Sequence, residues 1–457
     1  MDRSGLAVLL FILLLFPFAL SGQEAKDTFR FSVSEAQAYA AKNNRSVQSS
    51  RVDIELANKK IWENLAEGFP QVNLSANYLH QFVVPEISFG PYLDKNLLPN
   101  GPLTKQDLVN AYKDSPLIPL GVMDNTTVDV TLSQLIFSGE YFVGLKATKV
   151  VKQVSEMALL RTEDQTKESV ADAYYSVLVL RENIRLLKGS EEALDKIYGE
   201  LVKMHEQGLN EDTDVDQMDL NRSNIRTMVT SLESQEEIAS KNLKYLLGVG
   251  FEQSITLTDS LAGIVREGNT WYKNLPEFKT GNSIDFQIAD DQKKISEILV
   301  NLEKSKSLPT LSAFYRHEEQ TNAPAFNFVV KDVVGATLSL PIFSSGMRSS
   351  RVNQARYNFE KAKLGLQDTE QALTLEFETA RKDYLTAYDN YVTNMRSMTL
   401  SKKVYDRTLI KYREGIASSL DVAQSQNQFL TADAGYYNSL LSLLTSKAKL
   451  DRLLRTT

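Results

Sequence analysis

The chain contains no cysteine and only three histidines among 457 residues. Without cysteine there are no disulfides, no thiolate catalysis, no cysteine-ligated zinc and no lipid on an N-terminal cysteine. Three scattered histidines form no nucleophile–base pair, and no phosphate-binding glycine loop with its lysine is present. We therefore predict a protein that is not an enzyme, with no catalytic residues, no cofactor, no metal and no energy source of its own.

The chain also lacks an excess of positive charge. Acidic residues number 58 and basic residues 51, which gives a formal charge of −7. Proteins that bind nucleic acid present a concentrated lysine and arginine surface to the phosphates. No such surface is visible in the sequence, so nucleic acid is not an expected partner.

Proline is rare and unevenly placed. Six of the 12 prolines lie between Pro85 and Pro119, whereas residues 120–275 and 342–457 contain none. Because proline interrupts helices, these two stretches, which also hold few glycines, predict unusually long helices. Residues 140–206 alone would form a helix about 100 Å long. No single globular core requires that length.

Long apolar runs are confined to the N-terminus. Residues 1–22 contain Arg3, an apolar run over 6–16, and small residues up to Ser21 and Gly22. This pattern predicts a signal peptide cut after Ser21 or Gly22, with an N-terminal membrane anchor as the alternative. No later window approaches the ~18–20 apolar residues of a membrane helix. An integral membrane part would therefore have to consist of strands.

An internal repeat organises the chain. Residues 131–139 (TLSQLIFSG) return at 337–346 as TLSLPIFSSG. Gly139 and Gly346 are 207 positions apart, as are Gly208 and Gly415. Such self-similarity indicates one structural unit used twice. We assign the first repeat to residues 23–257, the second to 283–457, and a connecting segment to 258–282.

Each repeat reads as a helix, a strand, a loop, a second strand and a long helical hairpin. In the first repeat we expect a helix from Ser34, as N-cap, to Glu67, strands over about 71–83 and 128–137, and a hairpin over about 140–248. In the second we expect a helix over about 283–305, strands over about 310–317 and 333–343, and a hairpin over about 347–455. The first repeat carries 33 extra residues between its strands, which read as one long loop.

The strand assignment rests on alternation of apolar and polar residues. Val72, Leu74, Ala76 and Tyr78 alternate with small polar residues, and the other three segments follow the same pattern. This alternation fits a membrane barrel and fits a half-buried soluble sheet equally well.

The hairpin assignment rests on coiled-coil spacing and on two glycines. Apolar residues recur at four-three spacing, interrupted by Glu191, over Ala173, Val177, Leu180, Ile184, Leu187, Leu194, Tyr198 and Leu201. A looser series in the second repeat includes Tyr384, Tyr391, Met395, Tyr405 and Tyr412. Gly208 and Gly415 are placed to turn the chain back. We expect His205, on this seam, to be a packing residue.

Taken together, these features resemble the TolC-like outer-membrane efflux protein family. The resemblance is carried by the two-fold repeat, Pro70 and Pro309 before the strands, the LSQLIFSG and LSLPIF segments, and the glycine turns followed by Asp-Val. It implies a mainly α fold with a transmembrane β part. Three chains would assemble as a homotrimer, with four strands from each completing a 12-stranded β-barrel and the hairpins forming an α-barrel tunnel.

The resemblance also implies a function. The protein would be the exit duct of a tripartite efflux or type I secretion system, located in the outer membrane and extending into the periplasm. It would conduct substrates passively and work with a periplasmic adaptor and an inner-membrane transporter. The alternative functions are a periplasmic coiled-coil scaffold or adaptor without a pore, and a soluble helical enzyme.

Candidate site residues lie at the two glycine turns and just beyond them. By resemblance, the adaptor contacts would be Gln207, Gly208 and Leu209 in one turn and Glu414, Gly415 and Ile416 in the other. Asp421 and Gln424 match the two acidic positions of the family's pore constriction. Asp214 and Asp216 belong to five acids after the first turn, which can attract cations at a pore mouth. Alternatively, Asp212 and Asp214 stabilise a helix N-terminus.

Two histidines occupy equivalent strand positions in the repeats. His80 lies beside Tyr78, and His317 lies beside Tyr315. We interpret them as part of a polar and aromatic girdle at a membrane interface. A metal site is the alternative, but no cysteine or acid cluster accompanies them in the sequence.

Overall fold

The computed structural model describes residues 28–87, 102, 104–113, 117–268, 277–323 and 327–454. The expected signal peptide at 1–22 lies outside these residues, as do most of the proline-rich loop and the middle of the connecting segment. The chain divides into two compact units, and each takes residues from both repeats. Unit 1 holds residues up to 51, 158–284 and those from 370, and unit 2 holds 52–157 and 285–369.

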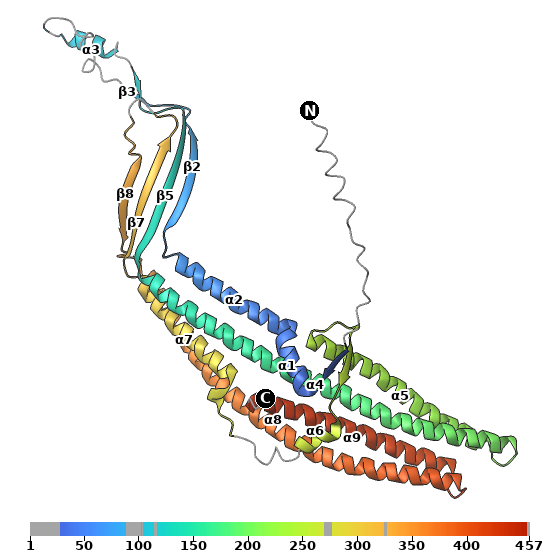
Figure 1. The fold of residues 1–457 in the computed structure, drawn as a ribbon. Coiled ribbons are helices and arrows are strands. Elements are labelled where there is room, and N and C mark those ends of the chain that lie inside the picture. The colour runs from blue at the N-terminus through green and yellow to red at the C-terminus, as the bar shows by residue number, and fades with distance from the viewer. Residues whose placement is uncertain are drawn as a thin grey trace, which may run out of the picture. The chain divides into compact units, whose positions relative to one another are not determined.

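Most of the residues in the secondary-structure elements are helical, as expected (Figure 1). In chain order they are β1 (Thr28–Phe31), α1 (Val33–Asn43), α2 (Arg45–Ala66), β2 (Gln71–His80), β3 (Glu86–Ile87), α3 (Lys105–Lys113), β4 (Ile118–Pro119), β5 (Asp124–Ser138), α4 (Gly139–Glu206), α5 (Asp212–Leu247), β6 (Ser254–Leu257), α6 (Leu261–Gly268), the 3-10 turn η5 (Thr280–Asn282), α7 (Ile284–Ser305), β7 (Thr310–Gln320), β8 (Asp332–Ser339), α8 (Met347–Arg413) and α9 (Ser419–Leu454). No helix within the described ranges is both long enough and apolar enough to cross a membrane.

Unit 2 contains one antiparallel sheet of four strands in the order β2-β5-β7-β8 (Figure 1). β2 pairs with β5 from Gln71↔Ser133 to His80↔Asp124, and β7 pairs with β8 from Thr310↔Ser339 to His317↔Asp332. β5 and β7 are the two central strands and join these two pairs. They are paired with each other from Thr127↔Gln320 to Ser138↔Thr310, with a bulge after Leu135. β2 and β8 are therefore edge strands.

The observed strands differ from the predicted ones at their ends. The strand predicted over 71–83 stops at His80, because its partner β5 begins at Asp124 directly opposite. The strand predicted over 333–343 stops at Ser339, since Pro341 has no N–H to donate and restricts Leu340. β5 and β7 run longer than predicted, because residues 124–127 pair with the end of β2 and residues 318–320 pair with β5.

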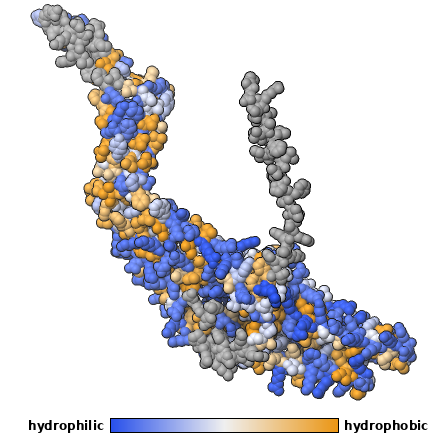
Figure 2. All heavy atoms as spheres, viewed as in Figure 1, coloured by the Kyte–Doolittle hydropathy of each residue, from blue (hydrophilic) through white to orange (hydrophobic). Residues whose placement is uncertain are grey.

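The alternation in the sequence gives the sheet one apolar face. The register places Leu74 beside Val130, and Leu132 beside Tyr315, which in turn faces Val334. These side chains are uncovered: Leu74 is 70% exposed and Val334 is 81% exposed. Figure 2 shows apolar side chains at the surface over this part of the chain. Exposure on this scale marks a surface that contacts something other than water.

Unit 1 contains most of the two helical hairpins, α4 with α5 and α8 with α9. In the first, ion pairs join Arg181 to Glu236 and Glu191 to Arg226, so α4 and α5 are antiparallel. The pair with Arg226 also explains how Glu191 is accommodated in an otherwise apolar seam. In the second, the rings of Tyr405 and Phe429 stack 5.5 Å apart between α8 and α9.

Most of the predicted seam is buried. Fully buried residues include Leu187, Leu194 and Tyr384, while Met395 is 40% exposed, so the looser second series is only partly a seam. His205 was predicted to pack in the seam, and this is wrong. Its ring is exposed, and Nδ1 lies 3.1 Å from the carbonyl oxygen of Asn210 at the helix end.

The first helix also differs from the prediction. Its N-cap is Ser32, not Ser34, and Ser32 forms a capping box with Glu35. The helix is broken at Asn44, where α1 ends and α2 begins. The Asn44 side chain donates to the carbonyl of Leu246 at 2.7 Å and accepts from the N–H of Ser46 at 2.8 Å. It thus caps the second helix while contacting a distant one.

Candidate functional site: the hairpin tips

The two hairpin tips have the same backbone geometry. Gly208 and Gly415 adopt φ values of +74° and +73°, in the left-handed region that favours glycine. Leu209 N–H donates to Met204 O at 2.9 Å, and Ile416 N–H donates to Lys411 O at 2.8 Å. These are the bonds of a Schellman motif, which ends a helix and reverses the chain. The predicted turns are confirmed.

The tips present apolar side chains to the surroundings. Leu209 is 65% exposed and Ile416 is 75% exposed, and Gln207 and Glu414 are exposed beside them. No described residue packs over them. A short turn with one uncovered aliphatic side chain is suited to enter a shallow apolar depression on another protein.

Asp421 has a structural role that the sequence reasoning missed. It is the third residue of α9, and its carboxylate accepts from both the N–H and the hydroxyl of Ser418, at 2.8 Å and 2.7 Å. The Asp421 N–H donates back to the Ser418 hydroxyl at 3.2 Å. This is a capping box. The bonds from Ser418 lower the pKa of Asp421, so the exposed group stays charged.

The acids after the first tip are distributed around the start of α5. Asp212 and Asp214 lie in its first turn, where a negative charge is favourable. Neither is the N-cap, which is Glu211, and its side chain makes no capping hydrogen bond. Asp216 is exposed, whereas Asp214 is half-buried near Tyr412 of the other hairpin. Burial, and secondarily the charge of Asp214, raise the pKa of Tyr412 to about 12.

Gln424 lines an open groove of about 750 Å³ between α8 and α9. Its walls mix amide, hydroxyl and aliphatic side chains and carry no charged group: Asn394, Leu420, Ala423, Gln424, Asn427, Gln428, Thr431 and Ala432. Asp421 lies one turn before Gln424 on the same helix. The structure thus places an exposed carboxylate next to a groove without charged groups.

Two contacts join the hairpins near their tips, and sequence reasoning found neither. Arg413 forms two bonds to Glu200, at 2.7 Å and 3.2 Å. Gln426, which is buried, donates to the backbone carbonyl of Asn221 at 2.8 Å. In each case the partners are more than 200 positions apart. No local pattern reveals such a pair.

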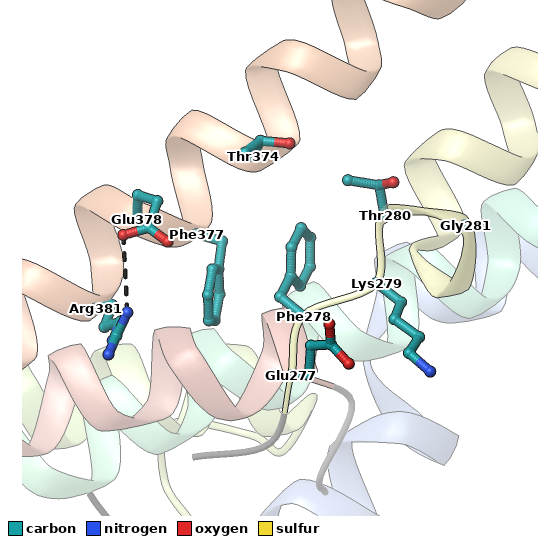
Figure 3. A pocket seen from close by; sticks show the side chains of 9 residues that line it. All are labelled: Glu277, Phe278, Lys279, Thr280, Gly281, Thr374, Phe377, Glu378 and Arg381. Atoms are coloured by element: carbon teal, nitrogen blue, oxygen red, sulfur yellow. Dashed lines mark ion pairs between the residues drawn. The ribbon is translucent and has the colours of Figure 1, made fainter.

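A second cavity, of about 570 Å³, lies between α8 and the loop before α7 (Figure 3). The rings of Phe278 and Phe377 stack at its base, 4.6 Å apart and nearly parallel. Glu378 and Arg381 form an ion pair at 4.0 Å on one side. The stacked rings fasten the end of the connecting segment to α8. The lining offers no nucleophile next to a base.

Comparison with known proteins agrees with this fold. Residues 282–455 match the family model described as outer membrane efflux protein. The chain is 19% identical over 429 residues to outer membrane protein TolC of Escherichia coli (strain K12), covering 90% of this chain and 80% of that protein. It is 20% identical over 407 residues to TolC of Salmonella enteritidis, covering 84% and 75%.

Solved structures are similar over most of their length. The Campylobacter jejuni CmeC outer membrane channel superposes with a TM-score of 0.69 at 18% identity, covering 92% of this chain and 85% of that one. VceC from Vibrio cholerae gives a TM-score of 0.65 at 16% identity, covering 92% and 95%. The second repeat, which nearly coincides with the matched residues 282–455, belongs to the outer membrane efflux protein family, and the chain as a whole has the fold of TolC-like channels. The family resemblance inferred from the repeat is thus confirmed. Members of this family are outer-membrane channels, and the tips and the groove beside Asp421 are its candidate site in this chain.

Proposed function

We propose that this chain is the outer-membrane exit duct of a tripartite efflux or type I secretion system. Three copies assemble, the four strands of each complete a 12-stranded barrel, and the hairpins of unit 1 line a tunnel through the periplasm. Conduction is passive, and an inner-membrane transporter joined through a periplasmic adaptor supplies the energy.

One observation carries this proposal: within the described residues, the sheet has two unpaired edges and an uncovered apolar face. Unpaired backbone N–H and C=O groups are not tolerated in lipid, where water cannot satisfy them. Pairing β8 of one copy with β2 of the next removes every edge. The apolar face then contacts lipid, while the face with Asn73, Ser75 and Thr131 contacts water. A soluble scaffold has no use for such a sheet.

The proposal is tested by placing a charge on either face of edge strand β8. A carboxylate on the lipid face is costly to insert, so Val334→Asp should abolish the heat-modifiable trimer and its current in planar bilayers. Thr337→Asp, on the opposite face of the same strand, should form trimers and conduct. A wild-type chain recovered as a soluble periplasmic monomer would overturn the exit-duct assignment and favour the scaffold.

The tips provide the adaptor contact in this proposal. Leu209 and Ile416, with Gln207, Gly208, Glu414 and Gly415 around them, enter apolar sites on the adaptor. Leu209→Ser combined with Ile416→Ser should reduce copurification of the adaptor at least tenfold, while the trimer persists. Ile238→Ser, which changes an equally exposed aliphatic residue of α5, is the matched control. Equal adaptor recovery from both variants would exclude the tips as the contact.

The constriction is assigned to the region of Asp421, Gln424, Asp214 and Asp216. Carboxylates at a narrow mouth concentrate cations and repel anions. Three copies of Asp421, held charged by Ser418, would make the pore selective for cations. Reversal potentials in a salt gradient measure this selectivity directly.

A further inference from the structure

The apolar face of the sheet carries two equivalent clusters of tyrosine, histidine and aspartate. Tyr78 donates its hydroxyl to Asp124 Oδ1 at 2.6 Å, and His80 Nδ1 lies 2.7 Å from the same oxygen. In the second repeat, Tyr315 donates to Asp332 Oδ1 at 2.7 Å and His317 Nδ1 lies 2.8 Å away. Because a carboxylate only accepts, each imidazole bonded to it carries its proton on Nδ1.

The two clusters are built by the same register. His80 pairs with Asp124 and His317 pairs with Asp332, and in each case the tyrosine lies two residues before the histidine. Each aspartate is the first residue of the strand that leads toward a long helix, so it lies at the end of that strand remote from the helix. The histidine-bearing strands also share Leu-Ser-Ala, at 74–76 and at 311–313. The two repeats thus keep this strand segment, and both place an aspartate opposite its histidine, which points to a common role.

Each cluster leaves one carboxylate oxygen available. Tyrosine and histidine both bind Oδ1, and within the described chain no donor reaches Oδ2 of either aspartate. The side chains of Asp124 and Asp332 are 51% and 61% exposed. Glu319, an acid on the same face, differs in that Lys331 neutralises it at 2.6 Å. No lysine or arginine of the described residues forms such an ion pair with the two aspartates.

The chemistry favours a hard cation shared with a phosphate. Among the described residues, no group of three or more histidine, aspartate and glutamate side chains could hold a metal. A transition-metal site with a full set of protein ligands is therefore not supported. Mg²⁺, by contrast, commonly keeps several waters and binds one or two carboxylates together with phosphate oxygens. A rigid, exposed carboxylate at the rim of a lipid-facing surface supplies the protein share of such a site.

Resting on the proposed function, we propose that Asp124 and Asp332 bind divalent cations that bridge the duct to phosphorylated lipid headgroups of the outer leaflet. Tyrosine and histidine hold Oδ1 and orient Oδ2 toward the lipid. The cation removes the repulsion between the carboxylate and the anionic phosphates. A trimer would carry two such contacts from each copy, arranged around its rim.

The test uses the full-length trimer in two kinds of vesicle, phosphatidylcholine alone and phosphatidylcholine with lipid A. The midpoint temperature of trimer dissociation is measured on gels with Mg²⁺ or with EDTA. For the wild type we expect Mg²⁺ to raise the midpoint by several degrees in lipid A vesicles only. The Asp124→Asn and Asp332→Asn double variant should lose this shift and conduct normally. Asp129→Asn, on the opposite face of β5 where Asp129 accepts from Ser75, should keep it.

The outcomes separate this inference from the proposed function. An equal Mg²⁺ shift in the double variant, or no shift in a wild-type trimer, overturns the lipid contact and leaves the duct intact. A shift in both kinds of vesicle shows binding that does not require the anionic phosphates of lipid A and overturns the bridge. A wild-type chain that forms no trimer in any vesicle, seen before Mg²⁺ is added, overturns both proposals.

Discussion

Arg413 lies 2.7 Å from Glu200, and this ion pair joins the end of α8 to the end of α4 across the two hairpins. Both side chains are 51% exposed, so the pair should contribute only about 0.2–1 kcal/mol and weaken in salt. Its position matters more than its strength. It restrains the two tips relative to each other, close to the proposed mouth of the duct.

We therefore predict that Arg413→Ala and Glu200→Ala raise single-channel conductance by the same factor, and that the double variant raises it no further. Such non-additivity is the signature of one broken interaction. Lys241→Ala, which breaks an ion pair within α5, should leave conductance unchanged. Independent effects of the two substitutions that sum in the double variant would show that the pair does not restrain the tips.

Asp421 combines a capping bond with a charge, and two variants separate these roles. Ser418→Ala removes the cap at a cost of about 1 kcal/mol and leaves the carboxylate. Asp421→Asn removes the charge and retains a side chain that can accept a hydrogen bond. We predict that cation selectivity, measured from reversal potentials, falls in Asp421→Asn and not in Ser418→Ala. The same loss in both variants would assign the effect to the helix end.

The capping box also predicts a pH dependence. The folded pKa of Asp421 is lowered from its ordinary value of 3.8, so its stabilisation is fully present above that value. It is lost as the pH falls through the lowered folded pKa. In an acid titration followed by the helical circular dichroism signal, the wild type should therefore unfold at a lower pH than Ser418→Ala.

Local patterns predicted the turns and the strands. Gly208 and Gly415 could be placed because a left-handed residue that ends a helix favours glycine, and the repeat showed both at one spacing. Alternation predicted four strands. The pattern Ser418-x-x-Asp421 was itself a readable capping signal, and it was overlooked in favour of a pore role.

Long-range contacts could not be predicted in the same way. No proline or glycine in the sequence around Asn44 indicates that the helix breaks there. The break depends on a hydrogen bond to Leu246, 202 positions away. The strand ends depend on which partner begins where, as His80 opposite Asp124 shows. The aspartates that complete the two histidine clusters became neighbours only through the register, so sequence reasoning saw the histidines without their partners.

The end of α5 offers a sharp test of packing against the broken helix. Gly248 has φ +76°, and a Cβ there would lie 2.5 Å from the backbone oxygen of Asn43. Gly415 has nearly the same φ with nothing within 4 Å. We predict that Gly415→Ala costs about 1 kcal/mol from backbone strain alone. Gly248→Ala should cost at least about 2 kcal/mol, because the backbone at Asn43 must also move. Urea unfolding followed by circular dichroism measures both, and equal costs would contradict the close approach.

Asp433 of α9 predicts an unusual response of the stability to pH. It is 1% exposed, and its Oδ1 has no hydrogen-bond partner among the described residues. Burial raises the pKa of Asp433 from 3.8 to about 7. A carboxyl whose pKa is higher in the folded state favours folding while it is protonated, so the penalty grows as the pH rises from about 4 to 7 and then stays constant. The shift corresponds to roughly 2–4 kcal/mol at neutral pH.

Asp433→Asn, of nearly the same shape, should therefore raise stability at pH 8 and change it little at pH 4. Asp389→Asn, on α8, is the control for charge removal alone. The free energy of unfolding of the wild type is compared with that of Asp433→Asn from pH 4 to pH 7. If the difference between them does not change over this range, the carboxylate is stabilised inside the bundle and the prediction is wrong.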